Sequence, residues 1–95
     1  MKKIEETSMT SLQGHVKVSY NRLVLVFGNP HLRNFDKSTV EWAFEHNGER
    51  FTIYDYKWES CQNDTVENFH VGGDSLRAVE MVRDALCKYD VQNWL

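Results

Sequence analysis

Carboxylates and tyrosines on one face of a predicted hairpin are the residues best placed to do chemistry. Strand alternation on either side of an Asn-Gly turn places four such residues on the same face: Glu41, Glu45, Tyr54 and Tyr56. The two glutamates would stand about 13 Å apart along one strand, too far to share a proton or to act as a glycosidase pair. Exposed tyrosines within a polar rim are instead typical of a protein contact, whereas the tail with Trp94 or a helix covering this face is the alternative. We therefore expect a binding surface rather than an active site.

An acidic stretch follows this hairpin. Residues 59–74 carry four acidic residues and no lysine or arginine. Such a patch suits a basic partner, for example a nucleic-acid-binding protein, whereas a solvated loop accounts for the same composition. The residues predicted to contact a protein partner are Glu41, Glu45, Tyr54, Tyr56, Asp64 and Glu67.

Two glycines before the last predicted helix suggest an alternative, the binding of a small ligand of the nucleotide type. Glycines beside a helix N-terminus let backbone amides approach an anion. No Gly-Lys-Ser/Thr follows, so the segment is not a P-loop, and Asp74 would repel an anion. A tight strand-to-helix turn explains the glycines more simply. The ligand residues of this alternative are Gly72, Gly73, Ser75 and Arg77.

Residues suited to metal binding or nucleophilic catalysis are present but isolated. No cysteine or histidine falls at the spacing of a metal site, and neither thiol has an activating neighbour. We therefore expect no metal, no cofactor and no catalytic residue, and free thiols in a reducing compartment. The residues concerned are His15, His31, His46, His70, Cys61 and Cys87.

Asp55 differs from the other acids because strand alternation places it on the apolar face, opposite Val40. A carboxylate there must find hydrogen-bond donors or stay at the edge of the sheet. We expect it to bond backbone amides or to pair with Lys57, since buried polar groups are usually satisfied within the structure. A contact with a ligand or a partner is the alternative.

The elements that would position these residues begin with a strand and a helix. His15–Val18 alternates polar and apolar residues, as strands do. Ser19 is a favourable N-cap, apolar residues then recur at helical spacing, and Gly28 ends the pattern. These signals predict a helix over 19–27, although its central apolar run also has strand propensity.

The hairpin is the best-determined element. Asn47-Gly48 between two strand-like runs is typical of a two-residue type I′ turn, so His46 must face Glu49. Glu45 then faces Arg50 as an ion pair worth at most ~1 kcal/mol. The further pairs are Phe44–Phe51, Ala43–Thr52, Trp42–Ile53, Glu41–Tyr54, Val40–Asp55 and Thr39–Tyr56. One face of the hairpin is the core face, and it carries Val40, Trp42, Phe44, Phe51 and Ile53. The opposite face is expected to be at least half solvated.

A short strand around Phe69 and Val71 and a final helix complete the pattern. The helix is capped by Asp74 or Ser75 and ends near Tyr89, and its apolar positions are Leu76, Val79, Val82 and Leu86. The order β-α-β-β-β-α predicts a small antiparallel sheet with two helices, an α+β fold. A flexible leader at 1–11 and a C-terminal tail at 90–95 would flank a single domain over 12–89.

Composition excludes several classes of protein. Ninety-five residues, 41% of them hydrophobic, can bury one core without metal or disulfides. A net charge of −3 is unlike that of proteins that bind the phosphate backbone of nucleic acids. No segment approaches the ~20 apolar residues of a membrane span, and no signal-peptide core follows Met1. We therefore expect a cytoplasmic protein without direct contact to nucleic acid or membrane.

Several segments occur together in a recognisable combination. In chain order these segments are Val18-Ser19-Tyr20-x-x-Leu23-Val24-x-x-Phe27-Gly28-x-Pro30, Lys37-x-Thr39-x-Glu41-Trp42, Asn47-Gly48, Thr52-Ile53-Tyr54-Asp55-Tyr56-Lys57 and Phe69-His70-Val71-Gly72-Gly73. In this combination the chain resembles small bacteriophage and prophage proteins. The resemblance implies a phage origin, a location in the host-cell cytoplasm and no known catalytic residues. We therefore predict a non-catalytic binding protein that inhibits or redirects a host protein, such as a host-defence factor.

Overall fold

The computed structural model describes residues 1–34, 38–55 and 66–94. The elements in these ranges are β1 (Lys2–Lys3), β2 (Ser11–Ser19), α1 (Tyr20–Phe27), β3 (Leu32–Asn34), β4 (Ser38–His46), β5 (Glu49–Tyr54), β6 (Val66–Gly73) and α3 (Arg77–Trp94). The predicted β-α-β-β-β-α order is confirmed. Two short strands that the sequence pattern did not predict, β1 and β3, are added to it.

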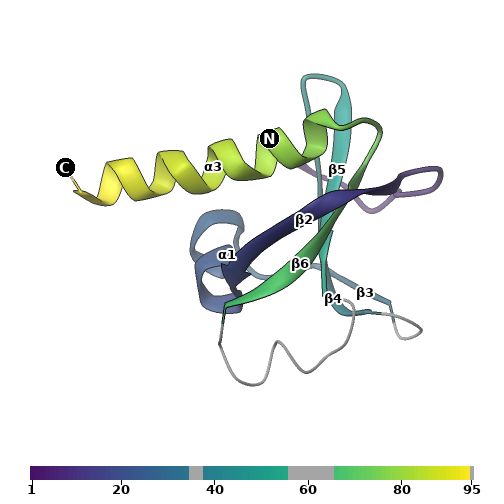
Figure 1. The fold of residues 1–95 in the computed structure, drawn as a ribbon. Coiled ribbons are helices and arrows are strands. Elements are labelled where there is room, and N and C mark those ends of the chain that lie inside the picture. Colours follow the sequence, from purple (N-terminus) through teal and green to yellow (C-terminus); the bar gives the residue numbers. More distant parts are fainter. Residues whose placement is uncertain (35–37, 56–65, 95) are drawn as a thin grey trace.

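The strands form one antiparallel sheet in the order β1-β4-β5-β6-β2, and β3 pairs with β4 on the same edge as β1. Figure 1 shows α1 and α3 on the same side of this sheet. The predicted α+β fold is therefore confirmed. One face of the sheet packs against the helices, and neither α1 nor α3 covers the other, which we call the helix-free face.

The hairpin of β4 and β5 has the predicted turn and register. Asn47 and Gly48 both have positive φ angles, 53° and 79°, as a type I′ turn requires. The six observed pairs, from His46–Glu49 to Glu41–Tyr54, are those predicted. The predicted partner of Thr39, Tyr56, lies outside the described residues.

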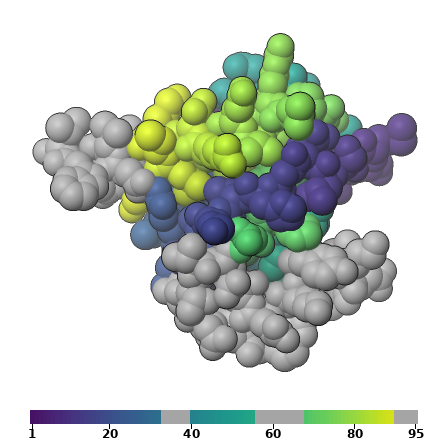
Figure 2. All heavy atoms as spheres, in the orientation of Figure 1, coloured from purple at the N-terminus to yellow at the C-terminus, as the bar shows by residue number. Residues whose placement is uncertain are grey.

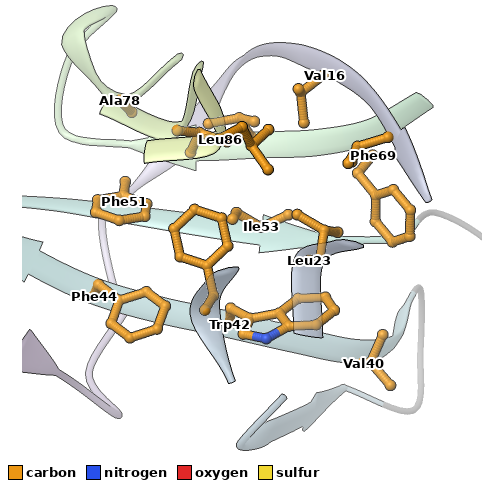
Figure 3. Packing of buried hydrophobic residues seen from close by; sticks show 14 residues of the cluster. Val16, Leu23, Val40, Trp42, Phe44, Phe51, Ile53, Phe69, Ala78 and Leu86 are labelled. Carbon is orange, nitrogen blue, oxygen red and sulfur yellow. The ribbon is translucent and has the colours of Figure 1, made fainter. Parts of the chain in front are cut away.

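The core lies between the sheet and the helices, around Trp42 (Figure 3). The indole N–H of this fully buried side chain donates a hydrogen bond to the carbonyl oxygen of Gly28 at 2.8 Å, so its polar atom is satisfied. All residues predicted for the core face of the hairpin are buried. They are Val40, Trp42, Phe44, Phe51 and Ile53.

Helix α1 begins and ends as predicted. The Ser19 hydroxyl accepts a hydrogen bond from the Arg22 N–H at 3.2 Å. At the other end, Gly28 has a φ of 85° and its N–H donates to the Val24 carbonyl at 2.8 Å. These are the favoured arrangements at the two ends of a helix. The two capping contacts and the burial of Leu23 and Phe27 together outweigh the strand propensity of the segment.

Helix α3 is longer than predicted. It begins at Arg77, whose N–H donates to the Ser75 hydroxyl at 3.2 Å, and it continues to Trp94. The predicted end near Tyr89 is therefore wrong, and so is the inclusion of Leu76, which precedes the helix and is 73% exposed. Apolar periodicity reports which residues of a helix are buried, so it can stop before the helix does.

The N-terminal residues, predicted as a leader, contact the sheet at several points. Strand β1 pairs with β4, with Lys2 opposite Glu45. The Ile4 N–H donates to the Ala43 carbonyl at 3.0 Å, and the Arg50 guanidinium donates to the Ser8 carbonyl at 2.9 Å. These are contacts to backbone groups and short strands, which hydrophobic periodicity cannot reveal.

Replacing Trp42 by alanine should lower the free energy of unfolding by ~3–5 kcal/mol, because a large core aromatic is removed. Tyr54→Ala, one position beyond Ile53 and on the helix-free face, should lower it by about 1 kcal/mol, as is typical of a substitution outside the core. Urea denaturation of the two variants measures the difference. Equal losses would contradict the assignment of the two faces.

Candidate functional site

A row of polar and aromatic side chains crosses the helix-free face. Glu41 on β4 pairs with Tyr54 on β5, Tyr54 pairs with His70 on β6, and His70 pairs with His15 on β2. Residues directly opposite one another on neighbouring strands lie on the same face of a sheet. The four side chains therefore form one line across four strands, and we call Glu41, Tyr54, His70 and His15 the polar row.

The three rings of the polar row are close neighbours. The ring centroids of Tyr54 and His70 are 5.2 Å apart, and those of His70 and His15 are 4.6 Å apart with the ring planes at 84°. Such an edge-to-face arrangement is favourable for aromatic rings. The polar row is thus one continuous surface feature.

Glu41 stands at the other end of the polar row. Its side chain is half-buried, and burial raises the pKa of its carboxyl. In the part of the chain that the structure describes, no hydrogen bond or ion pair reaches this carboxylate. A carboxylate that has lost part of its water without gaining a donor is unfavourable for stability, and such groups are frequent at functional sites.

Burial also changes the pKa of the two central groups of the polar row. The pKa of Tyr54 is raised, first by burial and then by the negative charge of Glu41. The pKa of His70 is lowered by burial and by neighbouring His15, while Asp55 acts in the opposite direction. The His70 imidazole therefore favours its neutral form near physiological pH.

Asp55 follows β5 and is only 1% exposed. Its carboxylate accepts a hydrogen bond from the Val40 N–H at 3.1 Å, which confirms the expected bond to a backbone amide. The residue expected as an alternative partner, Lys57, lies outside the described residues. Asp55 thus has a structural role and also acts on the charge state of His70.

The other residues predicted to contact a protein are not part of the polar row. Glu45 is exposed and lies opposite Arg50 in the sheet. The predicted ion pair between them is wrong, because the Arg50 guanidinium pairs with Asp74 at 2.7 Å. Glu67 lies on β6, and two further predicted residues, Tyr56 and Asp64, lie outside the described ranges.

The two glycines of the small-ligand alternative are the last residues of β6 and do not form a turn. A Cβ atom on Gly73 would lie 2.5 Å from the Ala78 Cβ and 2.8 Å from the Arg50 carbonyl oxygen. A Cβ atom on Gly72 would lie 2.7 Å from the Thr52 hydroxyl. Close packing of β6 against its neighbours therefore accounts for both glycines without a ligand.

Ser75 and Arg77, the other residues of that alternative, bind a carboxylate of this chain. The Ser75 hydroxyl donates to Glu49 at 2.9 Å, and the Arg77 guanidinium pairs with Glu49 at 3.3 Å. A depression of about 280 Å³ next to Arg77 is also lined by Glu80 and Asp84. Because three carboxylates surround this hollow, its electrostatics oppose the binding of a phosphate group.

The sequence pattern did not reveal that His15 and His70 are neighbours. Their contact depends on the register of β2 against β6, which a bulge between Leu12 and Gly14 shifts by one residue. The two strands are also distant in the chain. The alternation of polar residues with valines in β2 indicates which side chains share a face. It does not identify the strand that pairs with β2.

No protein-family model, curated protein or solved structure matches this chain. Across the ranges that the structure describes, neither helix combines the length and the apolar character needed to cross a membrane. Within the same ranges, no group of three or more histidine, cysteine, aspartate or glutamate side chains is arranged to hold a metal ion.

Glu41→Gln should stabilise the protein at neutral pH. Folding raises the pKa of Glu41 above its ordinary value of 4.5, so the folded state loses stability as the pH rises from that value through the folded-state pKa. Glutamine does not titrate. The variant should therefore have a melting temperature a few degrees above that of the wild type at neutral pH, and the gain should vanish below the ordinary pKa.

Thermal denaturation followed by circular dichroism across this pH range makes the measurement. A variant less stable than the wild type at neutral pH would show that the Glu41 carboxylate has a favourable partner in the folded protein.

Proposed function

We propose that this chain is a non-catalytic binding protein that docks a protein partner through the polar row. The observation that carries this proposal is the Glu41 carboxylate, half-buried and with no donor among the described residues. An arginine or lysine of a partner would supply that donor and neutralise the charge. The unfavourable burial of Glu41 would then be offset in the complex.

Tyr54 adds a second element that suits a protein interface. It lies between a carboxylate and an imidazole on β5, which pairs with a strand on each side, and its side chain is half-buried. Little side-chain entropy remains to be lost when a partner covers a tyrosine held in this way. Tyrosines of this kind are frequent among the residues that contribute most to binding energy.

The charge of the chain favours a basic partner. The net charge is −3, and Glu45 is exposed on the strand that also carries Glu41. Complementary charges accelerate association and disfavour acidic competitors. A nucleic-acid-binding protein offers such a basic surface, which this chain would occupy without touching nucleic acid itself.

The resemblance to phage proteins suggests the biological class of the partner. We propose that the chain acts in the cytoplasm of a bacterial host, where it inhibits or redirects a host protein such as a defence factor. This assignment rests on the sequence combination described above and on the binding surface, and it requires no catalytic residue.

The test is retention of a host protein by the purified, tagged chain and by variants of its surface. The double variant Tyr54→Ala with Glu41→Gln should reduce retention roughly tenfold or more, because one tyrosine anchor and one charge are lost from the same patch. The matched control is Glu80→Gln with Asp84→Asn, which removes two exposed charges from α3. The control variant should retain the partner as the wild type does.

Two outcomes would contradict the proposal. If the polar-row variant retains the partner fully while Asp64→Lys with Glu67→Lys loses it, the acidic stretch is the binding surface. If no variant changes retention, or if no host protein is retained, the proposed surface has no protein partner. Circular dichroism must first show that each variant is folded.

A further inference from the structure

We propose that His15 and His70 form a two-histidine site for a divalent late transition-metal ion such as Zn²⁺, Ni²⁺ or Cu²⁺. This inference goes beyond the proposed function, because it rests on the opposite end of the polar row from Glu41. Imidazole is the side chain that these ions prefer in proteins when no thiolate is present.

The geometry brings the two imidazoles close enough to share one ion. His15 and His70 are direct cross-strand partners with ring centroids 4.6 Å apart. With Zn–N bonds of about 2.0–2.1 Å, two imidazoles on one tetrahedral ion have their centroids roughly 5 Å apart. Small side-chain rotations are therefore sufficient, and the paired strands hold the two residues in place.

Access from solvent is open on the β2 side. His15 is exposed and His70 is half-buried. In Figure 2, the atoms of β2, in dark blue and purple, lie at the molecular surface below α3. An ion can therefore reach the pair without opening of the core, and among the described residues no third metal-ligating side chain converges on it.

The surroundings of His70 favour the protonation state that binds metal. Only neutral imidazole is a ligand, and the pKa of His70 is lowered by burial and by His15. Asp55 contributes a nearby negative charge, whereas Lys17, exposed two residues along β2, contributes a positive one.

Isothermal titration of the full chain with ZnCl₂, NiCl₂ and CuCl₂ tests the site. We expect saturable binding of one ion per chain in the micromolar range, with Cu²⁺ tightest, and no binding of Mg²⁺, which prefers oxygen ligands. His15→Gln and His70→Gln should each weaken binding roughly tenfold or more. His46→Gln, at an exposed histidine beside the hairpin turn, is the matched control and should leave binding unchanged.

Imidazole nitrogen resonances of the wild type give a readout that does not depend on the variants. Addition of Zn²⁺ should shift the signals of His15 and His70 and leave those of His46 in place. Absence of saturable binding, or binding that survives both His15→Gln and His70→Gln, would overturn the site. Because no protein partner is present, this result is independent of the partner-retention test.

Discussion

The two-residue turn at Asn47 and Gly48 is the constraint on which the rest of the structure depends. With both residues at positive φ, the turn allows one register of β4 against β5. That register directs Trp42 toward the helices and Glu41 toward the helix-free face. A slip of one residue would exchange the two faces along the slipped strand, which would bury the glutamate and expose the tryptophan. The core and the polar row are therefore two consequences of the same turn.

The remaining strands extend this register across the sheet by close contacts of the backbone. Gly73 lets β6 approach Ala78 of α3 and the Arg50 carbonyl, where any larger residue would clash. Asp74 then holds the guanidinium and the backbone N–H of Arg50. These contacts fix β6 beside β5 and so place His70 next to Tyr54. A motif that resembles a phosphate-binding loop in the sequence is thus explained by packing.

The polar atoms of the buried Trp42 and Asp55 side chains have hydrogen-bond partners, and half-buried Glu41 differs from them. The Trp42 indole bonds the Gly28 carbonyl, and Asp55 bonds the Val40 amide. Glu41 is half-buried without such a bond among the described residues. It lies on the one face of the sheet that neither helix covers. A group that is unfavourable for folding and lies at an accessible place is typical of a functional site.

The sequence by itself determined the features that depend on local signals. The type I′ turn, the pairing of Glu41 with Tyr54 and the capping of α1 by Ser19 follow from residue types within a few positions of one another. Tertiary structure alone decided the contact between His15 and His70, the ion pair of Arg50 with Asp74, and the pairing of Lys2 with Glu45. These contacts join segments far apart in the chain, and their register depends on a bulge and on close packing, for which hydrophobic periodicity carries no signal.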